Sequence, residues 1–179
     1  MRRLIALACV LMLAGCVRAP MRAHIVLPSL HLPPVALGHT LAEQQQLVFH
    51  FGRESREMTA LLEVDAEALR LAVEALGQTG VRLHWDGRNL DERRAAWLPP
   101  QVRGARVLDD IQFVLWPADV IRAALPSGWR LEATSTQRRL LSGDTAWLSA
   151  RYDATGVELE NAAEGYRLDI QSHAIGSTP

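Results

Sequence analysis

The sequence predicts a mainly β domain in which one curved antiparallel sheet carries a short helical insert. Three observations lead to this prediction. Apolar residues alternate with a period of two between Leu47 and Trp85, change to a helical spacing between Leu108 and Leu125, and return to a period of two from Gly128 onward. A period of two places apolar side chains on one face of a strand, whereas spacings of three and four residues place them on one face of a helix.

The chain begins with a segment typical of a bacterial lipoprotein signal peptide. Two arginines precede an apolar run, Leu4 to Leu13, that is too short to cross a bilayer core needing ~20 apolar residues. The run continues into the letters LAGC, which match the lipobox and end at Cys16. In proteins with this motif the cysteine receives a diacylglycerol group and, after cleavage, an amino-terminal acyl chain such as palmitate. We predict a signal peptide over residues 1–15 and a lipid anchor on Cys16.

The residue after the lipidated cysteine indicates the membrane in which the lipoprotein is anchored. Val17 stands where an aspartate retains lipoproteins in the inner membrane of enterobacteria, which favours the periplasmic face of the cell outer membrane. Three acyl chains bury far more methylene groups than one myristoyl chain, so the attachment should be permanent. The other cysteine, Cys9, falls in the signal peptide, so no disulfide is expected after cleavage.

Residues 16–40 are predicted to form a tether between the anchor and the domain. Four of the nine prolines lie in this stretch, and it has no clear hydrophobic period. Its histidines, His24, His31 and His39, are spread along the segment and are therefore not expected to form a metal site. Residues 41–179 then make up the folded domain, which is of ordinary size for one core.

Four strands are expected in the first half of the domain. Their apolar positions are Leu47, Phe49 and Phe51; Met58, Ala60, Leu62 and Val64; Leu69, Leu71, Val73 and Ala75; and Val81, Leu83 and Trp85. The segments between them, GRES, VDAE, GQTG and DGRN, contain residues that favour turns. The pattern predicts an antiparallel meander.

Two short helices are expected between Leu108 and Leu125. Pro117 fits the first turn of the second helix, and Pro126 ends it. Asp109 and Asp110 are interpreted as helix-start residues, which the helix dipole favours.

The period of two returns in GWRLEATSTQRRLL, TAWLSARY, VELEN and GYRLDIQS. Because each strand has one apolar face, a curved sheet with its concave side covered by the helices satisfies all of them.

This order of elements resembles LolA and LolB, the periplasmic lipoprotein carrier and its outer-membrane receptor. Their fold is an open half-barrel with helices as a lid. The run LDDIQFVLWPADVIRAALPSGWRLE, together with RRLLSGD, ARY and ENAAEGYRLDI, resembles more closely an uncharacterised family of LolB-like outer-membrane lipoproteins. Genes of that family lie, in many bacteria, among those for aryl-polyene or related fatty-acid-like synthesis. The resemblance implies an α+β half-barrel covered by short helices.

Charge and motifs argue against several classes of function. All 19 basic residues are arginines, and the sequence contains 20 acidic residues and no dense basic run. Nucleic acid is therefore not an expected partner. The sequence has no Gly-x-Ser-x-Gly elbow, and its acidic pairs are adjacent residues that point in different directions. We expect no catalytic residues, metal or cofactor beyond the lipid on Cys16, and the protein is not expected to be an enzyme.

The tryptophans suggest where a ligand would bind. All five lie beyond residue 84. Aromatic residues are common in cores, but apolar walls with few polar groups also suit a lipid chain. The predicted ligand-binding residues are Phe113, Leu115, Trp116, Trp129 and Trp147.

Leu76 is a candidate contact with the membrane. It lies on the polar side of its strand, next to a turn, in the sequence Leu76-Gly77-Gln78-Thr79. The resemblance to LolB implies a protruding leucine that places the incoming lipoprotein in the membrane. The alternative is that Leu76 packs at the edge of the sheet.

These features together predict a monomeric outer-membrane lipoprotein that accepts or carries a lipidic molecule without catalysis. The cargo would be an aryl-polyene-type lipid or a lipidated protein, handed over by a periplasmic LolA-like carrier. The alternative is an assembly or scaffolding lipoprotein that binds a protein partner. A carrier should have a dry apolar cavity under its helices, whereas a scaffold should have a filled sheet and an exposed apolar patch.

Overall fold

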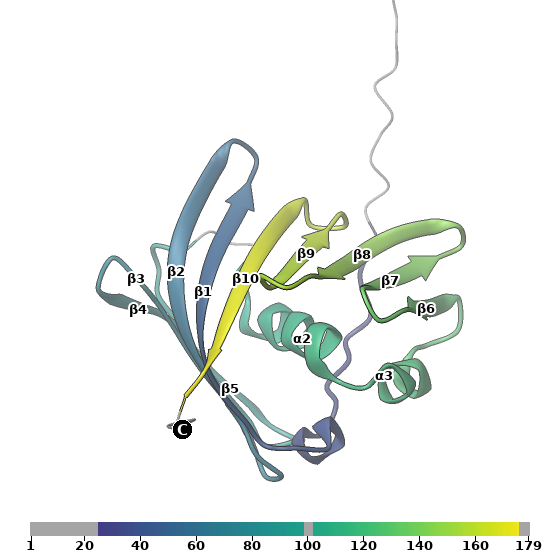
Figure 1. Cartoon of the computed structure of the whole chain (residues 1–179), viewed down its shortest axis with the longest axis horizontal. Coiled ribbons are helices and arrows are strands. Elements are labelled where there is room, and N and C mark those ends of the chain that lie inside the picture. Colours follow the sequence, from purple (N-terminus) through teal and green to yellow (C-terminus); the bar gives the residue numbers. More distant parts are fainter. Residues whose placement is uncertain (1–24, 99–101, 176–179) are drawn as a thin grey trace, which may run out of the picture.

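The computed structural model describes residues 25–98 and 102–175, and within them ten strands form one open antiparallel sheet. The sheet is curved, and two short α-helices lie on its concave side (Figure 1). Its strands follow the order β5-β4-β3-β2-β1-β10-β9-β8-β7-β6, so two meanders meet where β1 pairs with β10. The predicted mainly β sheet with a helical insert is confirmed. The predicted signal peptide and Cys16 lie outside the described residues.

The first meander precedes the helices. Its strands are β1 (Leu41–Phe51), β2 (Glu54–Val64), β3 (Leu69–Ala75), β4 (Gln78–Trp85) and β5 (Leu90–Arg94). The first four correspond to the four predicted strands. The prediction missed β5 because its sequence, LDERR, is mostly charged and exposed and therefore shows no apolar alternation.

The second meander follows the helices. Its strands are β6 (Trp129–Ala133), β7 (Gln137–Ser142), β8 (Thr145–Tyr152), β9 (Val157–Asn161) and β10 (Tyr166–Ala174). The stretch predicted to alternate without a break after Gly128 divides into β6 and β7. The backbone N–H of Gln137 donates to Thr134 Oγ1 at 3.1 Å, and this bond supports the turn between the two strands.

The first helix, α2 (Gly104–Leu115), begins ahead of its predicted start. Asp109 and Asp110 therefore lie within the helix and are buried, so their interpretation as helix-start residues is wrong. Glu92 of β5 serves the helix start instead, because its Oε1 accepts a 2.7 Å hydrogen bond from the N–H of Gly104. A Cβ at residue 104 would overlap the side chains of Glu92 and Leu83, so glycine permits this approach.

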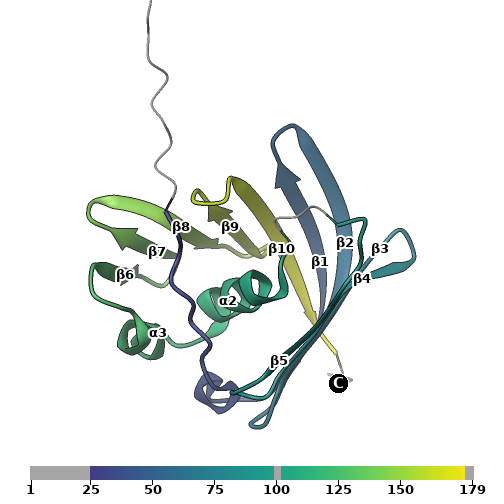
Figure 2. The same cartoon turned by 180° about the vertical axis from the view of Figure 1, so that it is seen from behind.

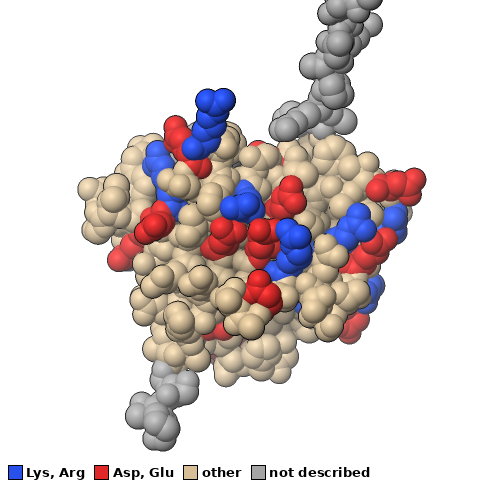
Figure 3. Space-filling model, turned by 45° about the horizontal axis from the view of Figure 1, so that its top comes forward, with Lys and Arg blue, Asp and Glu red and all other residues tan. Residues whose placement is uncertain are grey.

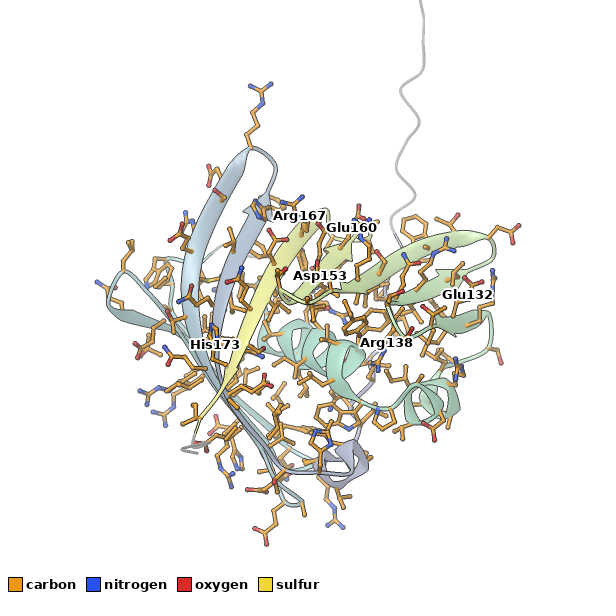
Figure 4. All side chains as sticks on the ribbon, viewed as in Figure 1. Glu132, Arg138, Asp153, Glu160, Arg167 and His173 are labelled. Atoms are coloured by element: carbon orange, nitrogen blue, oxygen red, sulfur yellow. The ribbon has the colours of Figure 1, made fainter. Side chains whose placement is uncertain are left out.

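The carbonyl groups at the end of α2 are bonded by the second meander. Arg138 of β7 donates to the carbonyl oxygens of Phe113 and Trp116 at 2.7 Å each, beside the end of the helix (Figure 4). The hydroxyl of Tyr152 on β8 donates to the carbonyl oxygen of Val114 at 2.8 Å. These are carbonyls that the helix itself cannot satisfy. The second helix, α3 (Ala118–Ala124), follows directly and contacts β6.

Residues 29–33, which we call the N-terminal strap, cross the outer side of α2 (Figure 2). The N–H of Leu30 donates to Asp109 Oδ1 at 2.8 Å. Gln112 binds both backbone groups of Leu32, accepting from its N–H at 2.9 Å and donating to its carbonyl oxygen at 2.8 Å. Leu30 and Leu32 are buried. Residues 29–33 therefore belong to the folded domain and not to the tether predicted over residues 16–40, because α2 bonds backbone groups of Leu30 and Leu32 and both leucine side chains are buried in the core.

Two tryptophans complete the attachment of the strap. The indole N–H of Trp85 donates to the carbonyl oxygen of Leu32 at 2.8 Å, and that of Trp116 donates to the carbonyl oxygen of Pro33 at 3.2 Å. A 3-10 helix, η1 (Pro34–Leu37), then leads into β1. None of the helices in the described parts of the chain is long and apolar enough to cross a membrane.

We expect Gln112→Met to lower the free energy of unfolding by about 2 kcal/mol, because it leaves the buried N–H of Leu32 without a partner and leaves Trp85 as the one donor to the Leu32 carbonyl oxygen. Equilibrium denaturation in urea measures the change. Gln44→Met, on the exposed side of β1, is the control and should change stability by less than about 0.5 kcal/mol. Equal losses in the two variants would contradict the role assigned to Gln112.

Candidate functional site

An apolar cavity of about 120 Å³ lies between α2 and the concave face of the sheet. One side of α2 contributes to its wall through Arg106, Val107, Asp110, Ile111, Val114 and Leu115. Asp109 and Gln112 lie between these positions in the helix, Trp116 directly follows the helix, and all three bind the strap instead. The helix therefore separates the strap from the cavity.

Strand β10 forms the longest wall of the cavity. Its alternate residues Tyr166, Leu168, Ile170 and Ser172 all line it. Tyr166 and Ser172 are six positions apart, which corresponds to about 20 Å along the strand, so the lining extends over most of β10. Apolar residues of β1, β2, β3, β4 and β9 supply the remaining sheet side: Leu47, Phe49, Met58, Leu62, Leu71, Val73, Val81, Val157 and Leu159.

The cavity is neither sealed nor large. Ile111 and Leu115 on the helix and Leu168 and Ile170 on β10 are half-buried, so water reaches part of the lining. Apolar cavities of about 150 Å³ bind ligands the size of benzene, whereas drug-sized ligands occupy about 300 Å³ or more. In its present shape the cavity can hold a segment of an apolar chain. A longer segment requires the half-buried side chains to move.

A buried polar cluster borders the cavity. Arg106 Nε donates to Asp110 Oδ1 at 3.0 Å, and the hydroxyl of Tyr166 donates to Asp110 Oδ2. Asn161 Nδ2 donates to the Tyr166 hydroxyl at 3.0 Å, and Arg106 also lies 3.7 Å from a carboxylate oxygen of Asp109. The cluster joins α2 to β9 and β10 across the end of the cavity.

The ionisation of the cluster follows from its burial. Burial raises the pKa of Asp110 from 3.8 to about 6, although the nearby Arg106 and the Tyr166 hydroxyl oppose this shift. Burial and the charge of Asp110 raise the pKa of Tyr166 well above its ordinary value. Burial by itself would lower the pKa of Arg106, but Asp110 and Asp109 raise it. Arg106 therefore stays charged and Asp110 can exchange a proton under mildly acidic conditions.

The five predicted ligand-binding residues are not brought together. Leu115 lines the cavity. Phe113 and Trp116 are 0% exposed and pack in the core outside the cavity lining. Trp129 is half-buried against the core, and Trp147 borders a separate surface hollow beside Arg151 and Glu160. Sequence reasoning favoured the large aromatics, whereas the lining is mostly aliphatic. The alternation of GYRLDIQS was a signal for β10, but it did not show which side of the strand would face a cavity.

Leu76 projects from the turn between β3 and β4. It is 97% exposed, and both turn residues have positive backbone angles, with φ of 52° at Leu76 and 72° at Gly77. Two-residue hairpin turns of this kind favour asparagine or glycine at the first position, because other side chains clash with the backbone there. Leucine is costly at this position, so packing within the fold does not account for it. Leu76 does not pack at the edge of the sheet.

The distribution of charge gives no sign of a second site on the one face that Figure 3 shows. Acidic and basic side chains are interspersed on the face seen in Figure 3, without a patch of one sign. Within the described residues no group of three or more histidine, cysteine, aspartate or glutamate side chains could hold a metal ion.

We expect Asp110→Asn to change how stability depends on pH. Folding raises the pKa of Asp110, so the native state binds this proton more tightly and protonation stabilises it. The stabilisation is complete below pH 3.8 and is lost as the pH rises through about 6. Across this range the wild-type protein should lose stability relative to Asp110→Asn by at most about 1.4 kcal/mol per pH unit. Denaturant titrations at several pH values measure the difference, and parallel curves would contradict the burial of an ionisable Asp110.

Comparison with known proteins identifies a family. No curated protein matches the chain. Residues 42–174, which run from the start of β1 to the end of β10, match a family described as "Protein of unknown function (DUF3261)". This match takes in all of the sheet except Leu41, both α-helices and every residue that lines the cavity. The chain therefore belongs to the DUF3261 family.

Proposed function

We propose that this protein is an outer-membrane lipoprotein that accepts and holds an apolar chain of a lipid or of a lipidated protein, without catalysis. The observation that carries the proposal is the cavity beneath α2, whose wall is apolar apart from Gln45, Ser172 and the Arg106–Asp110–Tyr166 cluster. Such a wall binds an alkyl or polyene chain by removing it from water, and no chemical step is required.

The proposed location rests on the sequence at the N-terminus. The lipobox ending at Cys16 supports a lipid anchor, and Val17 supports the periplasmic face of the outer membrane. The strap begins at residue 29, so a short segment would connect the anchor to the side of α2 that faces away from the cavity. The domain would then work close to the membrane surface.

The nature of the cargo is proposed from the resemblance to LolB-like lipoproteins. The curved open sheet with helices on its concave side is compatible with a half-barrel of that kind. An aryl-polyene-type lipid or a lipidated protein, delivered by a LolA-like carrier, is the cargo that this resemblance favours. The alternative of a scaffolding lipoprotein that binds a protein partner is less well supported, because that role does not account for the apolar cavity.

We propose that Leu76 enters the membrane when cargo is transferred. Its exposure and its strained backbone both support a role outside the fold, because strain that stability does not require is often retained at functional positions. A leucine at the tip of a hairpin can reach the boundary between headgroups and acyl chains without disturbing the sheet.

Ile111→Trp should block the cavity. Ile111 is half-buried on the cavity side of α2, so a larger side chain occupies the space of the ligand while partly remaining in solvent. We expect the affinity for a fluorescent fatty-acyl probe to fall at least about tenfold, which corresponds to about 1.4 kcal/mol. Leu61→Trp, on the outer face of β2, is the matched control and should bind the probe normally. Unchanged binding by Ile111→Trp, with a normal melting temperature, would exclude this cavity as the site.

Two substitutions, Leu76→Asn and Leu76→Glu, distinguish an effect on the stability of the fold from an effect on membrane contact. Leu76→Asn should raise the free energy of unfolding by about 1 kcal/mol, because asparagine accepts the left-handed backbone more readily than leucine. Both variants should still bind the acyl probe but pass labelled cargo to liposomes more slowly, since neither side chain enters the membrane favourably. The single variant Cys16→Ala, which lacks the predicted lipid anchor and keeps Leu76, serves as the unanchored reference. Normal transfer by both variants would remove Leu76 from the mechanism.

A further inference from the structure

Gln45 is a polar residue in the apolar wall of the cavity. It lies on β1 next to Leu47, lines the cavity, and is 7% exposed. Its Nε2 donates to Glu43 Oε2 at 3.1 Å and to Ser172 Oγ at 3.2 Å. Ser172 is exposed, so this part of the cavity is close to solvent.

The orientation of the Gln45 amide follows from its partners. An ionised carboxylate can accept hydrogen bonds but cannot donate them, so the group that faces Glu43 must be the amide NH₂. Glu43 and Ser172 together occupy both hydrogens of that group. The carbonyl oxygen, Oε1, is then left without a donor among the described residues. An unsatisfied buried acceptor is costly, and buried acceptors in native proteins nearly always have a partner.

The charges around the cavity limit what that partner can be. Of the described residues that line it, Arg106 and Asp110 are the charged ones, and they pair with each other. The carboxylate of Glu43 lies beside Gln45. An ionised carboxylate or phosphate headgroup placed at Gln45 would be partly buried next to another negative charge, without a cation to balance it.

We propose that Gln45 Oε1 accepts a hydrogen bond from the uncharged headgroup of a single-chain amphiphile, through an O–H or an N–H. The inference rests on the proposed function and names the class of ligand for the same cavity. The headgroup lies near the solvent-exposed Ser172, and the chain extends along Leu47 and Phe49 of β1 and Ile170 and Leu168 of β10. Long-chain alcohols, monoacylglycerols and N-acyl amides carry such a headgroup.

Three ligands of equal carbon number test this assignment: octanol, methyl heptanoate and ionised octanoate. Octanol can donate a hydrogen bond, the ester can only accept one, and octanoate is charged. Displacement of a fluorescent apolar probe measures their affinities for the full chain carrying Cys16→Ala, which removes the predicted anchor and its lipid. The same substitution is present in every variant.

Gln45→Met keeps the length of the side chain and removes its hydrogen-bonding groups. The ratio of octanol affinity to ester affinity should fall by about twofold to tenfold in this variant, the effect of one hydrogen bond. Gln45→Asn, which withdraws the amide by one methylene, should lower the same ratio, whereas Gln46→Met on the opposite, exposed face of β1 should not. Octanoate should bind the wild-type protein more weakly than octanol.

The outcomes separate this inference from the proposed function. An unchanged affinity ratio in Gln45→Met and Gln45→Asn, or octanoate binding as tightly as octanol, would overturn the assignment of Gln45 and leave the carrier function standing. If neither the fluorescent probe nor any of the three ligands binds the wild-type protein, the carrier function fails and the inference fails with it.

Discussion

The architecture depends on hydrogen bonds from side chains to backbone groups that regular secondary structure leaves unpaired around α2. Glu92 bonds the N–H of Gly104 at the helix start, and Arg138 bonds two carbonyls at its end. Gln112 bonds both backbone groups of Leu32 in the strap. Each of these groups is taken out of water when α2 docks on the sheet, and leaving one unpaired would cost as much as a lost hydrogen bond. These hydrogen bonds therefore fix the position and the rotation of α2 against the sheet.

The fixed position of α2 explains why a cavity remains. The sheet is curved, and its two halves diverge from the pairing of β1 with β10. A helix that is bonded to β5 at one end and to β7 and β8 at the other cannot move deeper into the curve. The aliphatic side chains of Ile111 and Leu168 then approach the space without filling it.

Three features of the described residues carry a cost in stability. Burial of Asp110 raises its pKa to about 6, the carbonyl oxygen of Gln45 has no donor among the described residues, and Leu76 occupies a backbone conformation that disfavours leucine. Asp110 and Gln45 border the cavity, while Leu76 is at the tip of a hairpin on the same half of the sheet as Gln45. Local conflicts of this kind concentrate at functional positions, which is consistent with the roles proposed for the cavity in ligand binding and for Leu76 in membrane contact.

The sequence by itself determined the class of fold and most of its elements, because strand and helix periods are local properties of the chain. The apolar alternation of β1 to β4 and the turn residues between them were sufficient to predict one face of the sheet. The lipobox and the sequence around Leu76 are also local features, and the lipid anchor and the membrane contact that they predict stay predictions. The charged strand β5 was missed because its place at the sheet edge leaves no apolar pattern.

Tertiary structure decided which residues share a site. Phe113 and Leu115 are two positions apart on one helix, yet Leu115 lines the cavity and Phe113 packs in the core. Asp109 and Asp110 are neighbours, yet one binds the strap and the other binds Tyr166. The direction of each side chain depends on how α2 is rotated against the sheet. That rotation is set by hydrogen bonds between residues up to 80 positions apart, which no local pattern in the sequence contains.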